Sequence, residues 1–456
     1  MAKLSKILIF IILPLLIFTG QSCQGPKQVG PKPVVLEYWR ISGQPDDLAE
    51  VIKNFRSRFS HIAINVRVIN PEDYEQALLE AWAEDRGPDI FSLPNTWLGK
   101  YQTKILPMPA FVELTRKYKK PVKVFGRVIK EDEVITKERI PGLSFFDLKR
   151  NFVDIVHLEV VRDNQILGLP LALDTLVLYF NRDLLNAVKI IEPAKTWEDF
   201  VSQIRNLTIF DQSGNLIQSG TALGTAYNIE NAPDILSLLM LQNGTKMTDA
   251  LGRAVFHQPL ESDPTYFPGE EALRFYTDFA NSEKETYSWN KQMSQDLEAF
   301  VQNKVAYFFG YSYHLPIIKK LAPQLNFDLA PVPQIGTSLK EINFARYFVE
   351  VVAKKSRYPK EAWAFLLFAA NADNIKPYLI KTRQPTAHRA LIALQMQDQE
   401  IAPLVSQVIT AQNWYRGKNW LVAEKAMRDM INDVNEGRRT IKEAINYYIQ
   451  VINQTM

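Results

Sequence analysis

An alternation of short apolar runs with amphipathic segments dominates the first part of the chain. The apolar runs at 34–39, 62–69 and 89–93 are expected to be strands, and the segments between them carry apolar residues at helical spacing. One segment starts at Asp46, and the other starts at Asn70, which is followed by proline and two acids. Strand, helix, strand, helix, strand at this spacing predicts a parallel sheet with helical crossovers, and therefore an α/β fold.

The carboxyl ends of these strands indicate where a ligand would bind, because open parallel sheets bind ligands beyond those ends. The loops at 40–45 and 94–99 carry hydrogen-bonding side chains and one flat aromatic ring. This mixture suits a neutral polyhydroxylated ligand, whose C–H face stacks on the ring while its hydroxyls are held by polar groups. The candidates are Arg40, Ser42, Gln44, Asn95, Thr96 and Trp97. The alternative is that these are ordinary loop residues and that Trp97 packs on a helix.

Composition narrows the class of protein. At roughly 100–200 residues per domain, 456 residues suggest two or three domains or one unusually large domain. The near balance of 53 Lys and Arg against 50 Asp and Glu gives no reason to expect a nucleic-acid partner. The single cysteine excludes an intramolecular disulfide and a multi-cysteine metal centre, and the five histidines show no metal-ligand spacing. We therefore expect neither a metal nor a cofactor.

The first residues indicate export. Lys3 and Lys6 precede an apolar run at 7–18, which as a helix would be about 18 Å long and too short for the ~30 Å hydrocarbon core. Residues 1–22 are therefore interpreted as a signal peptide rather than a spanning helix.

The end of this leader is similar to a bacterial lipobox. Gly20 and Ser22 are small residues before Cys23, which predicts that Cys23 is lipidated. The alternatives are an ordinary signal peptide and an uncleaved anchor. Residues 23–34, rich in Pro, Gly and Lys, are expected to form a flexible tether. These features predict a protein anchored by lipid at the extracytoplasmic face of the membrane.

Six segments, in order, carry a family resemblance. The most informative is an apolar strand that contains one acid, Asp174, followed by a helix start with capping residues at 196–199. The six segments read WRISGQPDDLAEVIKNF, GPDIFSLPNTWLGKY, GLPLALDTLVLYFNRDLL, PAKTWEDF, NKVAYFFGYSYHLPII and YPKEAWAFLLFA. The chain from about Val35 to Ile452 thereby resembles the family 1 extracellular solute-binding proteins of bacterial ABC importers, a group that includes the maltodextrin-binding proteins.

The resemblance implies a two-lobed periplasmic-binding-protein-like fold of type II. Each lobe would be a mostly parallel sheet flanked by helices, with the ligand cleft between the lobes. Crossings between lobes are expected near 171–174, 308–310 and 344–349. These crossings give the expected bounds, which are 35–171 and 310–345 for lobe 1 and 172–309 and 346–456 for lobe 2. Residues 117–166 exceed the family pattern and suggest an added hairpin beside the cleft mouth.

The resemblance also nominates ligand-binding residues at the crossings and in the second lobe. They are Asp174, Tyr311, Tyr313, Arg346, Trp414 and Trp420. An acid within an apolar strand costs free energy unless something pairs with it, so Asp174 either binds solute or pairs with Arg346 or Arg40. The two tyrosines either stack on a ligand or pack in the core. The polar loop at 228–231 is a weaker candidate.

The function implied is capture of a small solute, with sugars and oligosaccharides favoured, and its delivery to an ABC permease and its ATPase subunits. The protein would be a monomer that closes its lobes over the solute. One alternative is a surface lipoprotein that senses a solute without importing it. The other is a secreted glycan hydrolase, although the chain lacks the G-x-S-x-G, H-E-x-x-H and phosphate-loop motifs of common catalytic sites.

Overall fold

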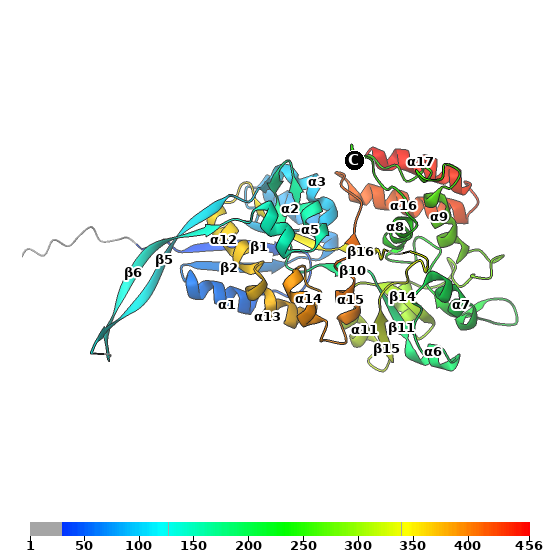
Figure 1. Cartoon of the computed structure of the whole chain (residues 1–456), viewed down its shortest axis with the longest axis horizontal. Coiled ribbons are helices and arrows are strands. Elements are labelled where there is room, and N and C mark those ends of the chain that lie inside the picture. The colour runs from blue at the N-terminus through cyan, green and yellow to red at the C-terminus, as the bar shows by residue number, and fades with distance from the viewer. Residues whose placement is uncertain (1–29, 126, 339) are drawn as a thin grey trace, which may run out of the picture.

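The computed structural model describes residues 30–125, 127–338 and 340–456. The expected signal peptide at 1–22, Cys23 and most of the expected tether at 23–34 lie outside the described residues. Two α/β lobes lie side by side along the long axis of the molecule (Figure 1). Among the described helices, none is both long and apolar enough to cross a membrane.

The first lobe is built on a six-stranded sheet of order β2-β1-β3-β17-β4, with β9 also paired to β17. Its strands are β1 (Val34–Arg40), β2 (Ile62–Val68), β3 (Ile90–Pro94), β4 (Ile105–Leu106), β9 (Gly168–Leu169) and β17 (Phe348–Ala353). The strands β1, β2 and β3 are parallel, as the sequence predicts, whereas β17 runs antiparallel to β3. The predicted crossovers are confirmed as α1 (Ala49–Arg58) and α2 (Pro71–Ala83).

Helices from both ends of the chain cover this sheet. Phe55 of α1 packs against Phe365 and Phe368 of α12 (Pro359–Ala369), with ring centroids 5.3 and 5.4 Å apart. The lobe also contains η1 (Asn95–Trp97), α3 (Leu98–Tyr101), η2 (Gln102–Lys104), α4 (Phe145–Asn151), α5 (Asp154–Val160), β7 (Val161–Arg162), β8 (Gln165–Ile166), α13 (Ala372–Thr382) and α14 (Arg389–Gln395).

The second lobe is built on a five-stranded sheet of order β12-β13-β14-β11-β15. Its strands are β11 (Val177–Asn181), β12 (Ile209–Phe210), β13 (Leu216–Thr221), β14 (Val305–Gly310) and β15 (Phe327–Ala330). Its helices are α6 (Arg182–Ala187), α7 (Trp197–Leu207), α8 (Ala232–Gln242), α9 (Pro268–Asp278), α10 (Asp296–Val301), α11 (His314–Leu321), α15 (Ala402–Ser406), α16 (Trp420–Asn435) and α17 (Ile441–Asn453). This sheet is mixed rather than mostly parallel, because β11 runs antiparallel to both of its neighbours.

A small three-stranded sheet joins the lobes. It has the order β10 (Asp174–Thr175), β16 (Asn343–Arg346), β18 (Ala411–Gln412), and Asp174 lies opposite Arg346 in its antiparallel pair. The expected crossings near 171–174 and 344–349 therefore match β10 and β16. The third connection between the lobes is the segment that leads from α14 of the first lobe to α15 of the second.

The expected crossing near 308–310 is wrong. These residues end β14, which is buried throughout and pairs with β11 and β13 inside the second sheet. In consequence the expected lobe bounds are also wrong in two places. Within 310–345, β15 pairs with β11 of the second lobe, and at the start of 346–456, β17 pairs with β3 of the first.

The insertion forms the expected hairpin, but in a different place. Strands β5 (Phe111–Val124) and β6 (Arg127–Pro141) pair antiparallel over their whole length. The resulting ribbon projects from the end of the first lobe that lies away from the second lobe (Figure 1). It therefore does not lie beside the gap between the lobes, where the sequence led us to expect it.

Candidate ligand-binding site between the lobes

Asp174 ties the strand that joins the lobes to the second lobe. Its carboxylate accepts hydrogen bonds from the Ser312 backbone N–H at 3.0 Å, the Ser312 hydroxyl at 2.7 Å and the Thr175 backbone N–H at 3.0 Å. Burial raises the pKa of Asp174 to about 6, although these hydrogen bonds act to lower it. The acid that the sequence singled out therefore has its own protein partners, and it fixes the turn that enters α11.

Two tyrosines flank Ser312 in this turn. Tyr311 is buried and donates its hydroxyl to the Asp234 carboxylate at 2.8 Å. Tyr313 is 39 % exposed and donates its hydroxyl to Glu230 at 2.6 Å. The two rings are nearly parallel with centroids 6.1 Å apart, and Tyr313 also stacks on His314 at 4.1 Å. Tyr313 is therefore a partly exposed aromatic ring that its neighbours hold in one orientation.

Charged groups of both signs surround this ring. Arg346, whose side chain is 44 % exposed, has Nη1 3.7 Å from the carboxylate of buried Asp234. Burial raises the pKa of Asp234, and the charge of Arg346 opposes that shift. Burial also acts to raise the pKa of Glu230, but the hydrogen bond and charge of His314, the Tyr313 hydroxyl and the charge of Arg346 together lower it to about 2. The site therefore presents an ionised carboxylate and a guanidinium, both partly exposed.

Helix α16 holds the loop that carries Glu230. Arg428 donates to the backbone carbonyls of Ile229 at 3.0 Å and Glu230 at 2.6 Å, and its guanidinium also contacts Glu424 at 3.1 Å. Beside this loop lies a hollow of about 680 Å³ whose lining, which includes Tyr227, Glu230 and Arg428, comes from the second lobe alone and contains none of the other residues of this site. A volume of this size suits a small ligand.

Several of these residues were not predicted from the sequence, and Glu230 was predicted only as part of a loop. Glu230 lies in the polar loop at 228–231, which was a weak candidate. Asp234 carried the signal that identified Asp174, namely a single acid in an otherwise apolar segment (APDILSLLMLQ). Nothing local marked Ser312 or Arg428, because each acts through a partner that is distant in sequence.

Arg40 does not extend into this site. It is 4 % exposed and donates to the Tyr378 hydroxyl at 2.8 Å, within the first lobe. Its expected role as a ligand-binding residue is therefore replaced by a core role. In the same loop Ser42 is half-buried and Gln44 is exposed, and the Gln44 backbone N–H donates to Asp47.

The residues after β3 are also buried and mostly contact other residues of the protein. Asn95 is buried and donates to buried Glu159 at 3.0 Å, while Glu159 also pairs with Arg416 at 2.9 Å. Thr96 is buried, and Trp97, 9 % exposed, packs against Tyr101 at 5.9 Å. The alternative in which Trp97 packs on a helix is the one the structure shows.

The two tryptophans before the terminal helices are core residues. Trp414 and Trp420 are 4 and 6 % exposed, and their rings meet edge to face at 6.3 Å. The Trp414 indole N–H donates to Ser237 at 3.0 Å. The structure thus brings together four of the predicted residues, Asp174, Tyr311, Tyr313 and Arg346, and places these two tryptophans in packing roles.

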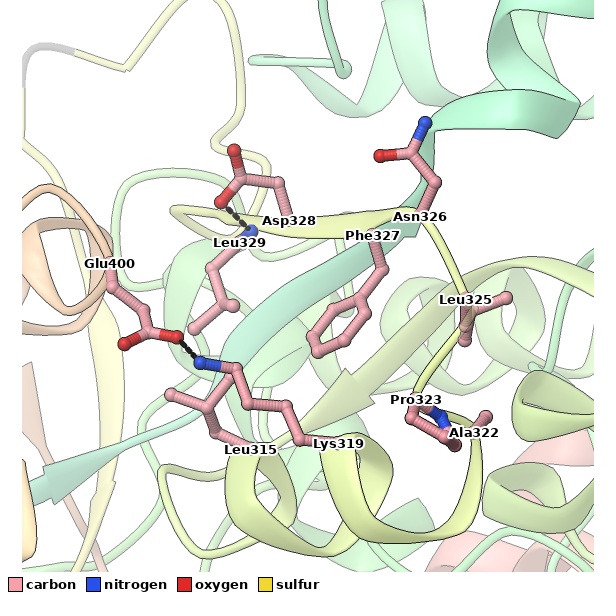
Figure 2. A pocket seen from close by; sticks show the side chains of 10 residues that line it. All are labelled: Leu315, Lys319, Ala322, Pro323, Leu325, Asn326, Phe327, Asp328, Leu329 and Glu400. Atoms are coloured by element: carbon pink, nitrogen blue, oxygen red, sulfur yellow. Dashed lines mark hydrogen bonds and ion pairs between the residues drawn. The ribbon is translucent and has the colours of Figure 1, made fainter.

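A second hollow of about 430 Å³ lies between α11 and β15 (Figure 2). Apolar side chains such as Leu315, Phe327 and Leu329 line it, and an ion pair between Lys319 and Glu400 lies along one side. None of the residues around Tyr313, namely Asp174, Glu230, Asp234, Tyr311 and Arg346, lines this second hollow. In the described part of the chain no group of three or more His, Cys, Asp or Glu side chains is placed to hold a metal ion.

Comparison with known proteins identifies the family. The profile of the family described as "Bacterial extracellular solute-binding protein" matches residues 42–376, well over half of the chain. The chain belongs to this family. The maltodextrin-binding protein MdxE of Bacillus subtilis (strain 168) is 24 % identical over 342 residues, which cover 70 % of this chain and 76 % of that protein. These relatives are binding proteins rather than enzymes, and the family is an extracellular one.

Solved structures show the same two-lobed fold. A cyclo/maltodextrin-binding protein complexed with maltotetraose is 15 % identical with a TM-score of 0.69, covering 93 % of this chain and 97 % of that one. A solute-binding protein from Thermotoga lettingae, bound with α-D-tagatose, is 18 % identical with a TM-score of 0.66, covering 92 % and 99 %. CpMnBP1 with mannobiose bound is 18 % identical with a TM-score of 0.65, covering 92 % and 100 %. This solute-binding protein therefore has the expected fold class.

Proposed function

We propose that this protein captures a sugar, preferentially an oligosaccharide, between its lobes and delivers it to an ABC permease. The observation that carries this proposal is the cluster beside the connecting sheet, where partly exposed Tyr313 donates to Glu230 and Arg346 pairs with the Asp234 carboxylate that holds Tyr311. An aromatic face together with charged hydrogen-bonding groups is the set that sugar recognition uses. The names and ligands of the relatives, maltodextrin, maltotetraose, tagatose and mannobiose, support the same solute class.

The position of the cluster links binding to lobe closure. Asp174 and Arg346 lie opposite each other on the two strands that cross between the lobes. Asp174 also holds the turn that presents Tyr313. A solute that contacts this cluster and the first lobe together would favour the closed arrangement, because it binds that state more tightly than the open one. A permease with its ATPase subunits would distinguish the two states by touching both lobes.

The proposed role requires no reaction on the solute. The protein would act as a monomer outside the cytoplasm, held to the membrane by lipid on Cys23. The carboxylates of the cluster serve as hydrogen-bond acceptors for hydroxyls, and those of Glu230 and Asp234 already accept from tyrosine hydroxyls. We therefore assign them to binding rather than to catalysis.

Titration with sugars tests the proposal. We expect one of the maltodextrins, mannobiose or tagatose to raise the melting temperature, because ligand at 100 times its Kd stabilises a protein by about 2.7 kcal/mol. Isothermal titration would then give the Kd, and the recovered sugar should be chemically unchanged. If polyamines or glycerol phosphates stabilise the protein and no sugar does, the proposed solute class is wrong.

Arg346→Met is expected to weaken binding of the cognate sugar about fivefold, which corresponds to about 1 kcal/mol for one lost hydrogen bond. Calorimetric titration of the variant measures this change. Arg205→Met is the matched control, because Arg205 is a half-exposed arginine of α7 that pairs with Glu285 at 2.6 Å. Equal affinities for Arg346→Met and the parent protein would remove Arg346 from the site.

A further inference from the structure

The tip of the β5–β6 hairpin exposes apolar side chains. Phe125 is fully exposed, and Val128 and Ile129 are 55 and 62 % exposed. Phe125 also has a backbone φ of +49°, a region that disfavours bulky residues and where hairpin turns usually place Asn, Asp or Gly. The turn therefore keeps a large apolar residue where folding alone favours a small or polar one. This choice indicates a contact outside the molecule.

Positive charge surrounds these apolar side chains. The end of the ribbon, residues 122–130, contains no acid and three basic residues, namely Lys123, Arg127 and Lys130, and Lys120 lies two register pairs further along, opposite Asp132. Among the described residues, no carboxylate lies within 4.0 Å of the charged groups of Lys120, Lys123 or Arg127. Closer to the lobe the ribbon is mixed in sign, as in the pair of Lys117 with Glu133 at 2.8 Å. The excess of positive charge is therefore confined to the tip.

Large apolar side chains ringed by lysine and arginine match the surface of an anionic bilayer. The apolar groups enter the boundary between headgroups and acyl chains, and the cations remain with the lipid phosphates. A protein strand that adds to the ribbon fits less well. Pro121 lies in β5, and a register shift between Val122 and Lys123 interrupts the ladder near the tip.

The place of the ribbon in the fold favours lipid over the permease. The tip lies at the end of the first lobe remote from the second (Figure 1), whereas a permease that detects closure must touch both lobes. Gly30, where the described chain begins, lies beside the middle of the ribbon, since a Cβ placed on it would be 3.9 Å from Cδ of Lys117 in β5. The first described residue and the ribbon therefore share one end of the molecule.

We propose that the hairpin tip inserts Phe125, Val128 and Ile129 into the surface of an anionic bilayer while Lys120, Lys123 and Arg127 contact the lipid phosphates. This contact holds the first lobe at a second point, in addition to the anchor expected at Cys23. The second lobe stays free to move. The proposal concerns a surface separate from the solute site, so it stands whether or not the solute is a sugar.

A fluorescent label at the tip tests the proposal in the full chain. Cys23→Ser removes the only cysteine, after which Val128→Cys accepts an environment-sensitive fluorophore. We expect vesicles of equal phosphatidylglycerol and phosphatidylcholine to shift its emission to the blue, and 0.5 M salt to reverse most of the shift. The matched control is a label at Leu251→Cys, an exposed position in the second lobe, which should not respond.

Charge reversal at the tip separates lipid contact from other causes. Lys120→Glu with Lys123→Glu and Arg127→Glu should raise the lipid concentration needed for half the shift at least tenfold. The same reversal at Lys189, Lys284 and Lys291, exposed lysines of the second lobe, should leave it unchanged. An absent shift, an equal shift with phosphatidylcholine alone, or a shift only with membranes that contain native proteins would overturn the proposal. The last result would indicate a protein partner.

Discussion

Replacing Arg40 by methionine is expected to lower the free energy of unfolding by about 1–3 kcal/mol, because it removes a buried hydrogen-bond donor and the positive charge that offsets a buried carboxylate. That carboxylate belongs to Glu350, which is 2 % exposed and accepts from the Ser92 hydroxyl at 2.6 Å. Burial raises the pKa of Glu350, and the positive charge of Arg40 opposes the shift. Arg40 also donates to the Tyr378 hydroxyl, so the substitution removes a buried hydrogen bond as well.

Equilibrium urea unfolding measures this loss, and a double-mutant cycle assigns its cause. Glu350→Gln together with Arg40→Met should be less destabilised than the sum of the two single variants, because the double variant contains no buried charge. Arg67→Met is the surface control. Its guanidinium lies over the Trp39 ring at 4.8 Å, and its loss should cost less than about 1 kcal/mol. An Arg40→Met protein that is fully stable but binds solute poorly would return Arg40 to the ligand site.

The wrong prediction for Arg40 shows that the direction of a side chain could not be predicted from the local sequence. The sequence predicted that the first strand ends at residue 39 and that Arg40 begins the following loop, and β1 ends one residue later, at Arg40 itself. The direction of its side chain depends on Tyr378, which lies 338 residues along the chain. The same holds for Trp414, whose partner Ser237 is 177 residues away. A residue type that suits a ligand suits a core equally well, and only distant partners distinguish the two roles.

Local periodicity was enough for much of the fold. The pattern of apolar residues located β1, β2 and β3 and their crossover helices, and the helix start expected at 196–199 is confirmed by α7, which Thr196 caps. Local periodicity could not predict the order of the strands within each sheet. An apolar run such as that of β14 (VAYFFG) fits a central strand and a crossing strand equally well. The pairing of β14 with β11 shows that it is a central strand of the second sheet. Because we had predicted a crossing strand there, the residues after β14 were assigned to the wrong lobe.

The acid inside an apolar strand was the signal that located the site, and its removal should have the largest effect on binding. Asp174→Ala is expected to weaken sugar binding at least tenfold, or about 1.4 kcal/mol. The substitution frees the turn at Ser312 that presents Tyr313, and it leaves the Ser312 N–H and hydroxyl without their acceptor. The unmet donors should also lower stability by about 1–3 kcal/mol. Calorimetric titration and urea unfolding measure the two effects.

Asp174→Asn tests the role of the charge, because the amide oxygen can still accept one of the hydrogen bonds from Ser312. With a pKa of about 6 in the folded protein and 3.8 as its ordinary value, Asp174 keeps a proton on folding that the unfolded chain has lost. Its contribution to stability therefore falls as pH rises from about 4 to 6, by an amount on the order of 2 kcal/mol. Asparagine has no such dependence, so the stability of Asp174→Asn relative to the parent protein should increase across this window and level off above it. A difference that stays constant from pH 4 to 7 would show that the carboxylate is ionised at no cost, and that Ser312 and Thr175 fully compensate its burial.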